Sequence, residues 1–313
     1  MSAIVTVTFS PCIDKSTTVS RLTPDIKLPC TAAKLEPGGG GINVARAIKK
    51  LGGEAVAVYP AGGYTGQFFT ALLHKEKIPT VVIETSHETR ENIIVLEKSS
   101  DRQYRLGMPG TLLMPNEWPE ILGRLEEMKD TAFIVASGSL PPGVPEDIFA
   151  RIAAIARKNN AKLLADTSGK ALQQVIAEGV FLIKPNLGEL GMLLGKEFLV
   201  PSAAPAAARQ LLRQSSCEVI VVSMGAEGAL LVTKDLAIKI VPPPVERKST
   251  VGAGDSMVAG IVFTLQKGGD IETAVKYGVA CGTAATLNPG TELCNKADTQ
   301  KIYNLLHITT VDS

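Results

Sequence analysis

Residues 249–255 are Ser-Thr-Val-Gly-Ala-Gly-Asp, and the apolar run Ser-Met-Val-Ala-Gly-Ile-Val-Phe follows at 256–263. Two glycines around one small residue let consecutive backbone N–H groups converge on one point, and a helix that begins there adds its unpaired amides and positive dipole end. We therefore expect Gly252, Ala253 and Gly254 to bind an anion such as a phosphate. Asp255, held ionised by the dipole, could accept a proton from a hydroxyl that attacks a phosphoryl group. The alternative is that Asp255 only caps the helix.

A second glycine-rich segment lies far upstream, at residues 36–48, with successive glycines at 38–41. Because glycine is costly in backbone entropy, and a tight turn into a helix over 43–50 would need fewer glycines, the run predicts backbone open to a ligand at Gly39 and Gly40. Asn43 offers a donor and acceptors to a sugar hydroxyl, and it is also a suitable N-cap for that helix. Both roles for Asn43 are compatible.

Composition narrows the class of partner. The chain has 313 residues, and its 32 Lys and Arg nearly balance 31 Asp and Glu, which argues against a nucleic-acid partner or a membrane surface and favours a small molecule. The five cysteines form no Cys-x-x-Cys pair, the first residues do not resemble a signal peptide, and no apolar stretch is long enough for a membrane span. These features predict a cytoplasmic protein.

Short Val- and Ile-rich runs alternate with helical patterns, which is typical of an α/β fold with a mostly parallel sheet covered on both faces. The expected strands are residues 4–9, 54–59, 80–84, 133–137, 162–166, 181–184 and 218–223, with a terminal hairpin at 230–233 and 237–241. Segments 15–35 and 90–106 have strand-like spacing without helices. They predict a small extra sheet that closes over a site as a lid and pairs with a second subunit.

Five motifs occur in the order found in the ribokinase-like (PfkB) sugar kinases, which the chain resembles over essentially its whole length. The motifs are residues 38–43, the Gly-Ser-Leu-Pro-Pro-Gly run from Gly138, Lys184-Pro185-Asn186-x-x-Glu189, Ser223-x-Gly225-x-x-Gly228 and residues 252–255. The resemblance implies a three-layer αβα sandwich with a mostly parallel central sheet. It also implies one kinase domain over residues 1–313, with a small β-sheet lid formed by about 15–36 and 88–107.

Within this superfamily, further motifs are most similar to the minor-type 6-phosphofructokinases. These motifs are Ser10-Pro11-x-Ile13-Asp14, the four-glycine run, Pro242-Pro243-Pro244, and residues 284–291, Ala-Ala-Thr-Leu-Asn-Pro-Gly-Thr. The resemblance implies ATP- and Mg²⁺-dependent phosphorylation of the 1-hydroxyl of fructose 6-phosphate. Glu292 departs from the pattern, because a basic residue is expected there. Tagatose-6-phosphate kinase and 1-phosphofructokinase share much of the pattern and remain alternatives.

The further candidates for the sugar site are Asp14, Lys27, Arg90 and Ser139. Asp14 follows the first predicted strand, where open α/β sheets bind ligands, and its carboxylate could accept two sugar hydroxyls, although a loop aspartate is often only solvated. Lys27 and Arg90, one from each lid segment, match the family's phosphate-binding positions, with Ser139 as a further donor. Arginine suits a phosphate because its guanidinium donates two parallel hydrogen bonds, whereas the alternative for Lys27 is a solvated charge.

The nucleotide and metal residues come largely from the resemblance. Asn186 and Glu189 have the spacing of a capping box, but in the family this motif arranges the Mg²⁺ and phosphate region, with Glu189 acting through metal-bound water. Lys184 could reach ATP phosphates, Ser223, Gly225 and Gly228 would line the nucleotide site, and Ala285 and Asn288 would lie by the adenine. The resemblance also implies that K⁺ is held by residues from two loops, namely Ser249, Val251, Ala285, Asn288 and Gly290.

Other classes of enzyme fit poorly. The chain has no Gly-x-x-x-x-Gly-Lys-Ser/Thr loop, and its three histidines, His74, His87 and His307, lack metal-ligand spacing and a nearby nucleophile motif. A sugar-phosphate sensor with the same fold is the non-enzymatic alternative, because fold does not fix function. Such a sensor would have little need for Asp255 between intact glycines.

Overall fold

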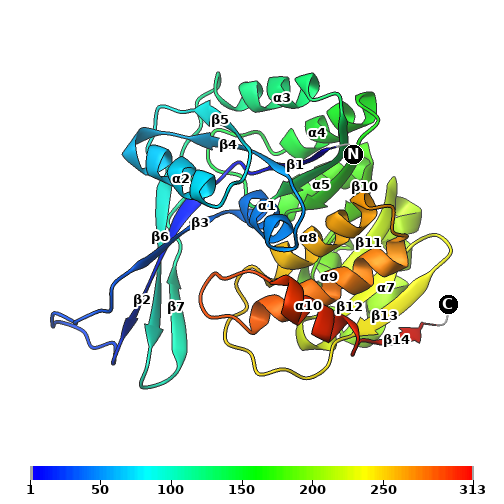
Figure 1. Ribbon diagram of the computed structural model, residues 1–313. Coiled ribbons are helices and arrows are strands. Elements are labelled where there is room, and N and C mark those ends of the chain that lie inside the picture. Colours follow the sequence, from blue (N-terminus) through cyan, green and yellow to red (C-terminus); the bar gives the residue numbers. More distant parts are fainter. Residues whose placement is uncertain (1–2, 312–313) are drawn as a thin grey trace.

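The computed structural model describes residues 3–311, which contain one large sheet and one small sheet (Figure 1). The strands of the large sheet are, in spatial order, β14 (His307–Thr310), β13 (Ala237–Val241), β12 (Ala229–Val232), β11 (Cys217–Ser223), β10 (Val180–Ile183), β9 (Lys162–Asp166), β8 (Thr131–Ser137), β1 (Ala3–Val7), β4 (Val56–Ala61) and β5 (Thr80–Glu84). The strands from β11 to β5 are parallel, and β12, β13 and β14 continue the sheet in antiparallel pairs. The expected mostly parallel sheet is therefore confirmed.

Helices cover both faces of the large sheet. One face carries α1 (Gly40–Lys50), α2 (Gly63–Lys75), α8 (Ala253–Gln266), α9 (Ile271–Thr286) and α10 (Lys296–Tyr303). The other face carries α3 (Trp118–Glu127), α4 (Ile148–Lys158), α5 (Gly169–Glu178), α6 (Leu187–Leu193) and α7 (Ala204–Gln214). Two short 3₁₀ helices, η1 (Pro201–Ala203) and η2 (Gly225–Glu227), lie in the loops. Among residues 3–311, no helix is both long and apolar enough to cross a membrane.

The two cores follow from the period of the strands. Along β9, Leu164 packs into the core beneath α1 and α8, whereas Leu163 and Ala165 pack into the opposite core. Successive side chains of a strand point to opposite faces, so a strand that is apolar at every position must be covered on both sides. This is why the continuous apolar runs in the sequence predicted a three-layer sandwich correctly.

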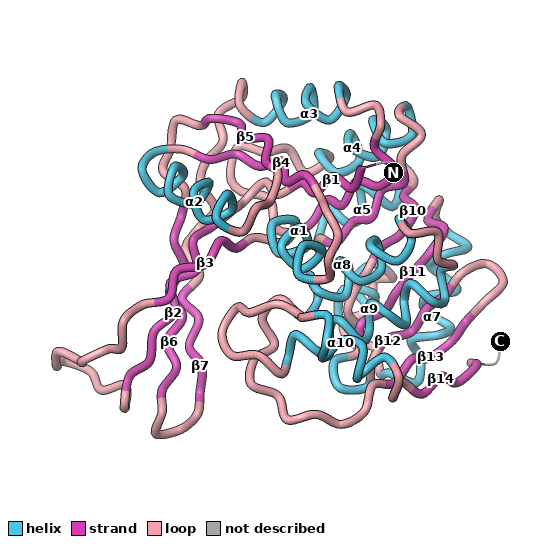
Figure 2. Tube along the Cα trace, viewed as in Figure 1, coloured by secondary structure: helices cyan, strands magenta, loops and turns pink. Residues whose placement is uncertain are grey.

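The small sheet has the order β3 (Lys34–Gly38), β2 (Cys12–Val19), β6 (Arg90–Glu97) and β7 (Arg102–Leu106). Strands β2 and β6 are parallel, and β3 and β7 flank them in antiparallel pairs. Figure 1 shows the sheet projecting from the body at the lower left, and in Figure 2 the loop 287–295 extends from the body toward it. Segments 15–35 and 90–106 thus form the small extra sheet that their spacing predicted.

Helix α8 is buried along most of its length. Its residues 256–263 are all buried, and α9 packs so closely that a Cβ on Gly260 would lie 2.6 Å from Cys281 Sγ. A helix that is apolar on every side belongs in the interior of a protein. The close packing against α9 fixes the position of the α8 N-terminus. The predicted anion site, residues 252–255, lies there, and we call it the anion turn.

Candidate active site

The predicted anion turn lies at the N-terminus of α8. Gly252 is the N-cap and has a left-handed backbone with φ of 72°, a conformation that favours glycine. Gly254 faces Lys184, because a Cβ there would lie 3.3 Å from Lys184 Nζ. The Ala253 N–H donates a long hydrogen bond of 3.4 Å to the Thr250 carbonyl oxygen. The turn therefore combines the first-turn amides of a helix with a nearby cation, which is the chemistry that binds a phosphate.

Asp255 lies in the first turn of α8 and contacts the glycine-rich segment across the site. The Asn43 side-chain amide donates a hydrogen bond of 2.9 Å to Asp255 Oδ2, although the two residues are 212 positions apart. Asn43 Oδ1 is buried and has no hydrogen-bond partner among residues 3–311. Because an unpartnered buried acceptor costs free energy, this oxygen is available for a ligand hydroxyl.

The expectation that Asn43 caps its helix is wrong. Helix α1 already begins at Gly40, its N-cap is Gly39, and Asn43 lies inside the helix. The side chain of Asn43 is free to reach Asp255 because the helix starts earlier than the sequence suggested.

Charges around Asp255 oppose one another. Burial and the nearby Asp166 raise the pKa of Asp255 to about 7, while the Asn43 hydrogen bond and Lys184 act to lower it. Lys184 follows β10, is 8% exposed, and forms a 3.2 Å ion pair with Asp166. Burial favours the neutral Lys184 amine, yet Asp166, Asp255 and Glu189 raise its pKa overall, so the ammonium persists beside the anion turn.

Asp14 lies on β2, at the base of the small sheet, and is buried. Asp14 Oδ1 accepts a 3.0 Å hydrogen bond from Asn92 on β6 and a 3.4 Å contact from the Cys12 thiol, whose pKa is raised by burial and by Asp14. A Cβ on Gly38 would lie 2.4 Å from Asp14 Oδ2. The carboxylate is thus held at the start of the glycine run.

The glycine run has a packing reason that the sequence argument underestimated. A Cβ on Gly39 would lie 2.9 Å from Thr8 Cγ2, one on Gly40 would lie 2.3 Å from Ser137 Oγ, and one on Gly41 would lie 2.5 Å from the Val7 carbonyl oxygen. Close approach of protein atoms is therefore one reason for these glycines. It is compatible with a ligand at Gly39 and Gly40, which are half-exposed, so that expectation stays a prediction.

The three predicted phosphate-binding residues differ in their placement. Arg90 begins β6 and donates to the carbonyl oxygens of Ser10, at 3.1 Å, and Met108, at 2.7 Å, while its buried Nε has no hydrogen-bond partner within residues 3–311. Ser139 follows Gly138, and a Cβ added to Gly138 would lie 3.4 Å from the Gly40 nitrogen. Arg90 and Ser139 therefore lie near the Asp14 and glycine-run regions, respectively.

Lys27 does not join them. It is exposed in the loop between β2 and β3, which extends from the far end of the small sheet (Figure 1). No contact links Lys27 to another predicted sugar-site residue in the part of the chain that the structure describes. No pattern in the sequence predicts where a residue of such a long exposed loop lies relative to the site.

A cavity of about 390 Å³ lies between the loop after β11, the segment 242–250 and helices α8 and α9. Its walls include the predicted Ser223, Gly225 and Gly228, together with Ala253 and Gly254 of the anion turn. Pro242, Pro243 and Pro244 line it, as do Val279, Gly282, Thr283 and Thr286 on one face of α9. Its size and partly apolar walls suit a nucleobase and ribose next to the phosphate turn.

Other predicted nucleotide residues lie outside this cavity. Ala285 is fully buried and points into the core, whereas its neighbour Thr286 lines the cavity. Asn288 donates to the Leu293 carbonyl oxygen at 3.0 Å. The helical spacing of 279, 282, 283 and 286 is a signal that could have identified the face of α9 that lines the cavity.

Asn186 and Glu189 do form a capping box at the start of α6. Asn186 Oδ1 accepts from the Glu189 backbone N–H at 2.9 Å, and Glu189 Oε2 accepts from the Asn186 N–H at 2.8 Å. Glu189 is half-buried and acts electrostatically on Lys184. The structural and functional interpretations of this motif are therefore compatible.

The loop after α9 returns to the segment before the anion turn. Ser249 Oγ donates to the Gly290 carbonyl oxygen at 2.7 Å, and the Lys248 N–H donates to the Thr286 carbonyl oxygen at 2.8 Å. Ser249 and Val251 are buried. The two segments that were expected to share a monovalent cation are thus adjacent.

Sequence reasoning missed Asn92 and Asp166, which hold Asp14 and Lys184, respectively. Asp166 ends the predicted strand 162–166, and strand ends of a parallel sheet are where ligands bind, so its position was a usable signal. Asn92 lies within a strand, where nothing in the sequence marks it.

The geometry brings together a partly apolar cavity, the turn at the start of α8 and a carboxylate that faces Asn43 of α1. In comparison with known proteins, residues 7–298 match the pfkB family carbohydrate kinases. The chain belongs to this family.

Among curated relatives, the ATP-dependent 6-phosphofructokinase isozyme 2 of Escherichia coli K12 is 43% identical over 98% of this chain and 99% of its own length. The isozyme 2 of Mycobacterium tuberculosis is 42% identical over 96% of this chain and 89% of its own length. A 1-phosphofructokinase of Borreliella burgdorferi is 31% identical over 98% of this chain and 99% of its own.

Solved structures of E. coli phosphofructokinase-2 superpose over 97% of this chain and 99% of theirs. The complex with potassium has a TM-score of 0.93 at 43% identity, and the complex with fructose 6-phosphate has a TM-score of 0.91 at 42% identity. Another structure of the same protein is a tetrameric inhibited form.

Proposed function

We propose that this carbohydrate kinase transfers the γ-phosphoryl group of ATP to the 1-hydroxyl of fructose 6-phosphate and releases ADP and fructose 1,6-bisphosphate. The hydrogen bond between Asn43 and Asp255 carries the proposal, because it brings a polyol-binding group to a carboxylate at the anion turn. The 43% identity to an ATP-dependent 6-phosphofructokinase over nearly the whole chain supports the substrate.

Asp255 acts as the general base in this proposal. Its pKa of about 7 lies near neutral pH, where a base is partly ionised and still strong enough to accept a proton from the sugar 1-hydroxyl. Asn43 orients the carboxylate through its amide and offers its unpartnered Oδ1 to a neighbouring sugar hydroxyl. The reacting oxygen is thereby aligned for in-line attack, which supplies most of the rate in phosphoryl transfer.

The amides of Gly252, Ala253, Gly254 and Asp255 receive the charge of the moving phosphoryl group. Preformed donors stabilise developing charge without reorganisation. Lys184, kept charged by Asp166, adds a cation on the same side. The Asp255 carboxylate therefore acts on the attacking hydroxyl, and the amides of the turn act on the transferred phosphoryl group.

Mg²⁺ would accompany the ATP phosphates. No group of three or more His, Cys, Asp and Glu side chains within residues 3–311 could hold a metal alone. Glu189 and Asp166 supply two carboxylates, and such a pair fits Mg²⁺, which keeps several waters and is bound by one or two carboxylates together with substrate phosphates. Glu189 and Asp166 would hold the hydrated ion, which supplies neutralising charge to the phosphates.

K⁺ would be held by oxygen atoms of Ser249, Val251, Ala285, Asn288 and Gly290. The fit rests on the adjacency of the two segments and on their carbonyl oxygens, which are the donors that hard cations prefer. When bound, the ion supplies positive charge behind the anion turn. The potassium complex of the E. coli relative supports this assignment.

Arg90, Ser139 and Lys27 would bind the 6-phosphate, and Asp14 with Gly39 and Gly40 would bind the sugar. Because Lys27 lies on a loop that projects from the molecule, it reaches a phosphate only by movement of the small sheet or from a neighbouring subunit. We therefore include in the proposal a dimer formed through the small sheet, which acts as a lid on one kinase domain. The proposal also includes a cytoplasmic location.

Two alternatives are separable by experiment. A 1-phosphofructokinase or tagatose-6-phosphate kinase would use the same base and anion turn with a different sugar. A sensor would bind a sugar phosphate without turnover, but the intact Asp255 and its raised pKa favour catalysis.

The test is ATP-dependent ADP release with Mg²⁺ on fructose 6-phosphate, tagatose 6-phosphate, fructose 1-phosphate, ribose and fructose. A clear kcat/KM preference for fructose 6-phosphate supports the proposal. Preference for another phosphosugar would keep the mechanism and replace the substrate, and no turnover on any of them would favour the sensor.

A further inference from the structure

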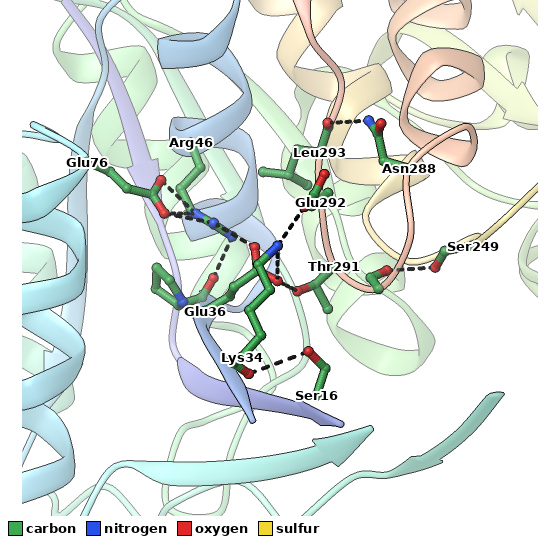
Figure 3. A network of polar contacts seen from close by, with 12 residues as sticks. Ser16, Lys34, Glu36, Arg46, Glu76, Ser249, Asn288, Thr291, Glu292 and Leu293 are labelled. Carbon is green, nitrogen blue, oxygen red and sulfur yellow. Dashed lines mark hydrogen bonds and ion pairs between the residues drawn. The ribbon is translucent and has the colours of Figure 1, made fainter. Parts of the chain in front are cut away.

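Two polar contacts join strand β3 of the small sheet to the loop between α9 and α10, residues 287–295 (Figure 3). Thr291 Oγ1 donates a 2.8 Å hydrogen bond to Glu36 Oε2, and Lys34 Nζ lies 2.6 Å from Glu292 Oε1. The partners are more than 250 positions apart in the chain. None of these four side chains has a role in the proposed transfer.

The inner contact is buried and anchored. Glu36 is 7% exposed and Thr291 is 2% exposed. The second oxygen of Glu36 lies 3.5 Å from Arg46 Nη2, and Arg46 in turn binds both oxygens of Glu76 (Figure 3). A buried carboxylate is retained only with such partners, so the Thr291 hydroxyl is bonded to a fixed point at the end of the small sheet.

The outer contact, between Lys34 and Glu292, is half-exposed. The Lys34 ammonium also lies 3.3 Å from Glu36 Oε2, so it is shared between two carboxylates. Although burial favours its neutral form, Glu292 and Glu36 raise the pKa of Lys34, and the hydrogen bond from Lys34 lowers the pKa of Glu292. Both groups are therefore charged at neutral pH.

The two ends of this connection lead to the two halves of the site. Beyond Glu36, strand β3 runs directly into the glycine run and contacts Asp14 through Gly38. On the other side, Leu293 packs against the anion turn, because a Cβ on Gly252 would lie 2.6 Å from Leu293 Cδ2. Asn288 and Ser249 hold the same loop through the Leu293 and Gly290 carbonyl oxygens.

We propose that Lys34, Glu36, Thr291 and Glu292 form a latch that couples the region of Asp14 and the glycine run to the anion turn, so that each substrate tightens the binding of the other. They are positioning residues, since they act through Gly38 and Leu293 and contact no reacting atom. The inference rests on the proposed function, because it requires a sugar phosphate at the first region and ATP at the anion turn. A ligand that shifts the small sheet must then also act on loop 287–295.

The test measures a coupling factor by calorimetry. This factor is the Kd of fructose 6-phosphate without nucleotide divided by its Kd with a saturating, non-hydrolysable ATP analogue and Mg²⁺. We expect a wild-type factor of about 5 or more, the usual range for coupled sites. Thr291→Val should bring the factor close to one, whereas Thr291→Ser, which keeps the hydroxyl, should retain it.

The outer pair is tested by Lys34→Met, Glu292→Gln and the double variant. Each single change should lower the factor, and the double variant should lower it no further, because the two residues act through one contact. The matched control is Lys15→Met with Glu91→Gln, an ion pair of 3.3 Å within the small sheet whose side chains are similarly exposed, at 40% and 38%. The control should keep the wild-type factor.

Several results would overturn the latch. These are a wild-type factor of one, a wild-type factor in both Thr291→Val and Glu292→Gln, or an equal loss in the Lys15 and Glu91 control. If Thr291→Val does not fold, the half-exposed Glu292 variant decides alone. Wild-type protein that binds no fructose 6-phosphate would contradict the proposed function itself and remove the latch with it, which distinguishes the two failures.

Discussion

At Asp255, burial and charge act in opposite directions on one carboxyl group. Burial and Asp166 raise its pKa, whereas Asn43 and Lys184 lower it, and the result is a group that titrates at about 7. An ordinary aspartate would be ionised but weakly basic at neutral pH. The neighbours of Asp255 therefore give this helix-start aspartate the raised pKa that the proposed role of general base requires.

The first prediction concerns pH. For wild-type enzyme, kcat/KM should fall by about tenfold per unit of pH below an apparent pKa of about 7, because only the ionised carboxylate accepts a proton. Asp166→Asn should move this apparent pKa downward, since it removes a negative charge and leaves Lys184 closer in effect to Asp255. The measurement is the pH dependence of kcat/KM for both proteins.

The substrate phosphate also titrates, with a second pKa of about 6, but Asp166→Asn does not alter the free substrate. A downward shift therefore belongs to the enzyme. An unchanged or higher apparent pKa in Asp166→Asn would show that Asp255 is not the group whose ionisation limits the rate.

A second prediction concerns Asn43. Asn43→Ala removes a hydrogen bond to a charged group, worth about 1.5–3 kcal/mol, which corresponds to roughly a 10- to 150-fold loss of kcat/KM. The variant also removes a buried unpartnered acceptor, so its melting temperature should not fall in proportion. Wild-type kinetics in Asn43→Ala would contradict its assigned role.

At the scale of elements, the anion turn depends on one left-handed residue at the start of α8. Gly252 has φ of 72° and packs under Leu293, while Gly268, just beyond the other end of α8, has φ of 86° with nothing near its Cβ position. The two glycines share the same backbone requirement but differ in their surroundings. They allow the conformational cost to be separated from displacement of the turn.

The third prediction uses this pair. Gly268→Ala should lower stability by about 1–2 kcal/mol, the cost of a left-handed alanine, and leave kcat unchanged. Gly252→Ala should lower stability further and reduce kcat, because the new methyl group displaces Leu293 or the turn. Thermal unfolding and steady-state kinetics of both variants provide the comparison, and equal kcat in the two would argue against the anion turn.

Sequence patterns predicted the elements better than the contacts between them. The strands at 80–84, 162–166 and 237–241 have the predicted bounds, because each is rich in Val, Ile, Leu or Ala and ends at a polar residue or before a proline. Strand β14 was missed, since all of its residues are exposed and show no alternation. Helix α1 begins before Asn43 because packing stabilises its first glycines, which have low helix propensity.

In the candidate site, too, the sequence predicted residues beside a motif better than the contacts between distant segments. Asp14, Asn43 and Asp255 lie beside recognisable motifs, and the structure brings Asn43 and Asp255 into contact. Asn92 was not predicted because strand pairing alone places it opposite Asp14. The link from Lys34 to Glu292 could not be inferred from sequence, since it depends on how strand β3 meets a loop more than 250 positions away.

At the scale of the whole molecule, the small sheet has an unpartnered edge strand, β7, and exposed apolar side chains. Leu106 on β7 is 53% exposed, and Met108 beyond it is 41% exposed. An edge of this kind is usually paired or covered. The exposed edge supports the proposed dimer through the small sheet.

The fourth prediction tests that interface. Leu106→Glu should convert the protein to monomers in sedimentation experiments, because a buried unpaired charge is costly. Leu305→Glu is the matched control, since Leu305 is 57% exposed and lies outside the small sheet. The dimer proposal fails if the Leu106 variant sediments like wild type, or if both variants dissociate equally.

The central claim is that Asp255 and the anion turn perform phosphoryl transfer to the 1-hydroxyl of fructose 6-phosphate. The most direct measurement compares wild-type protein with Asp255→Asn, using calorimetry for fructose 6-phosphate binding and single-turnover formation of fructose 1,6-bisphosphate for chemistry. We predict similar binding and a loss of at least about 10²-fold in the rate of product formation, the usual contribution of a positioned base. Product formed at nearly the wild-type rate by Asp255→Asn would contradict the account.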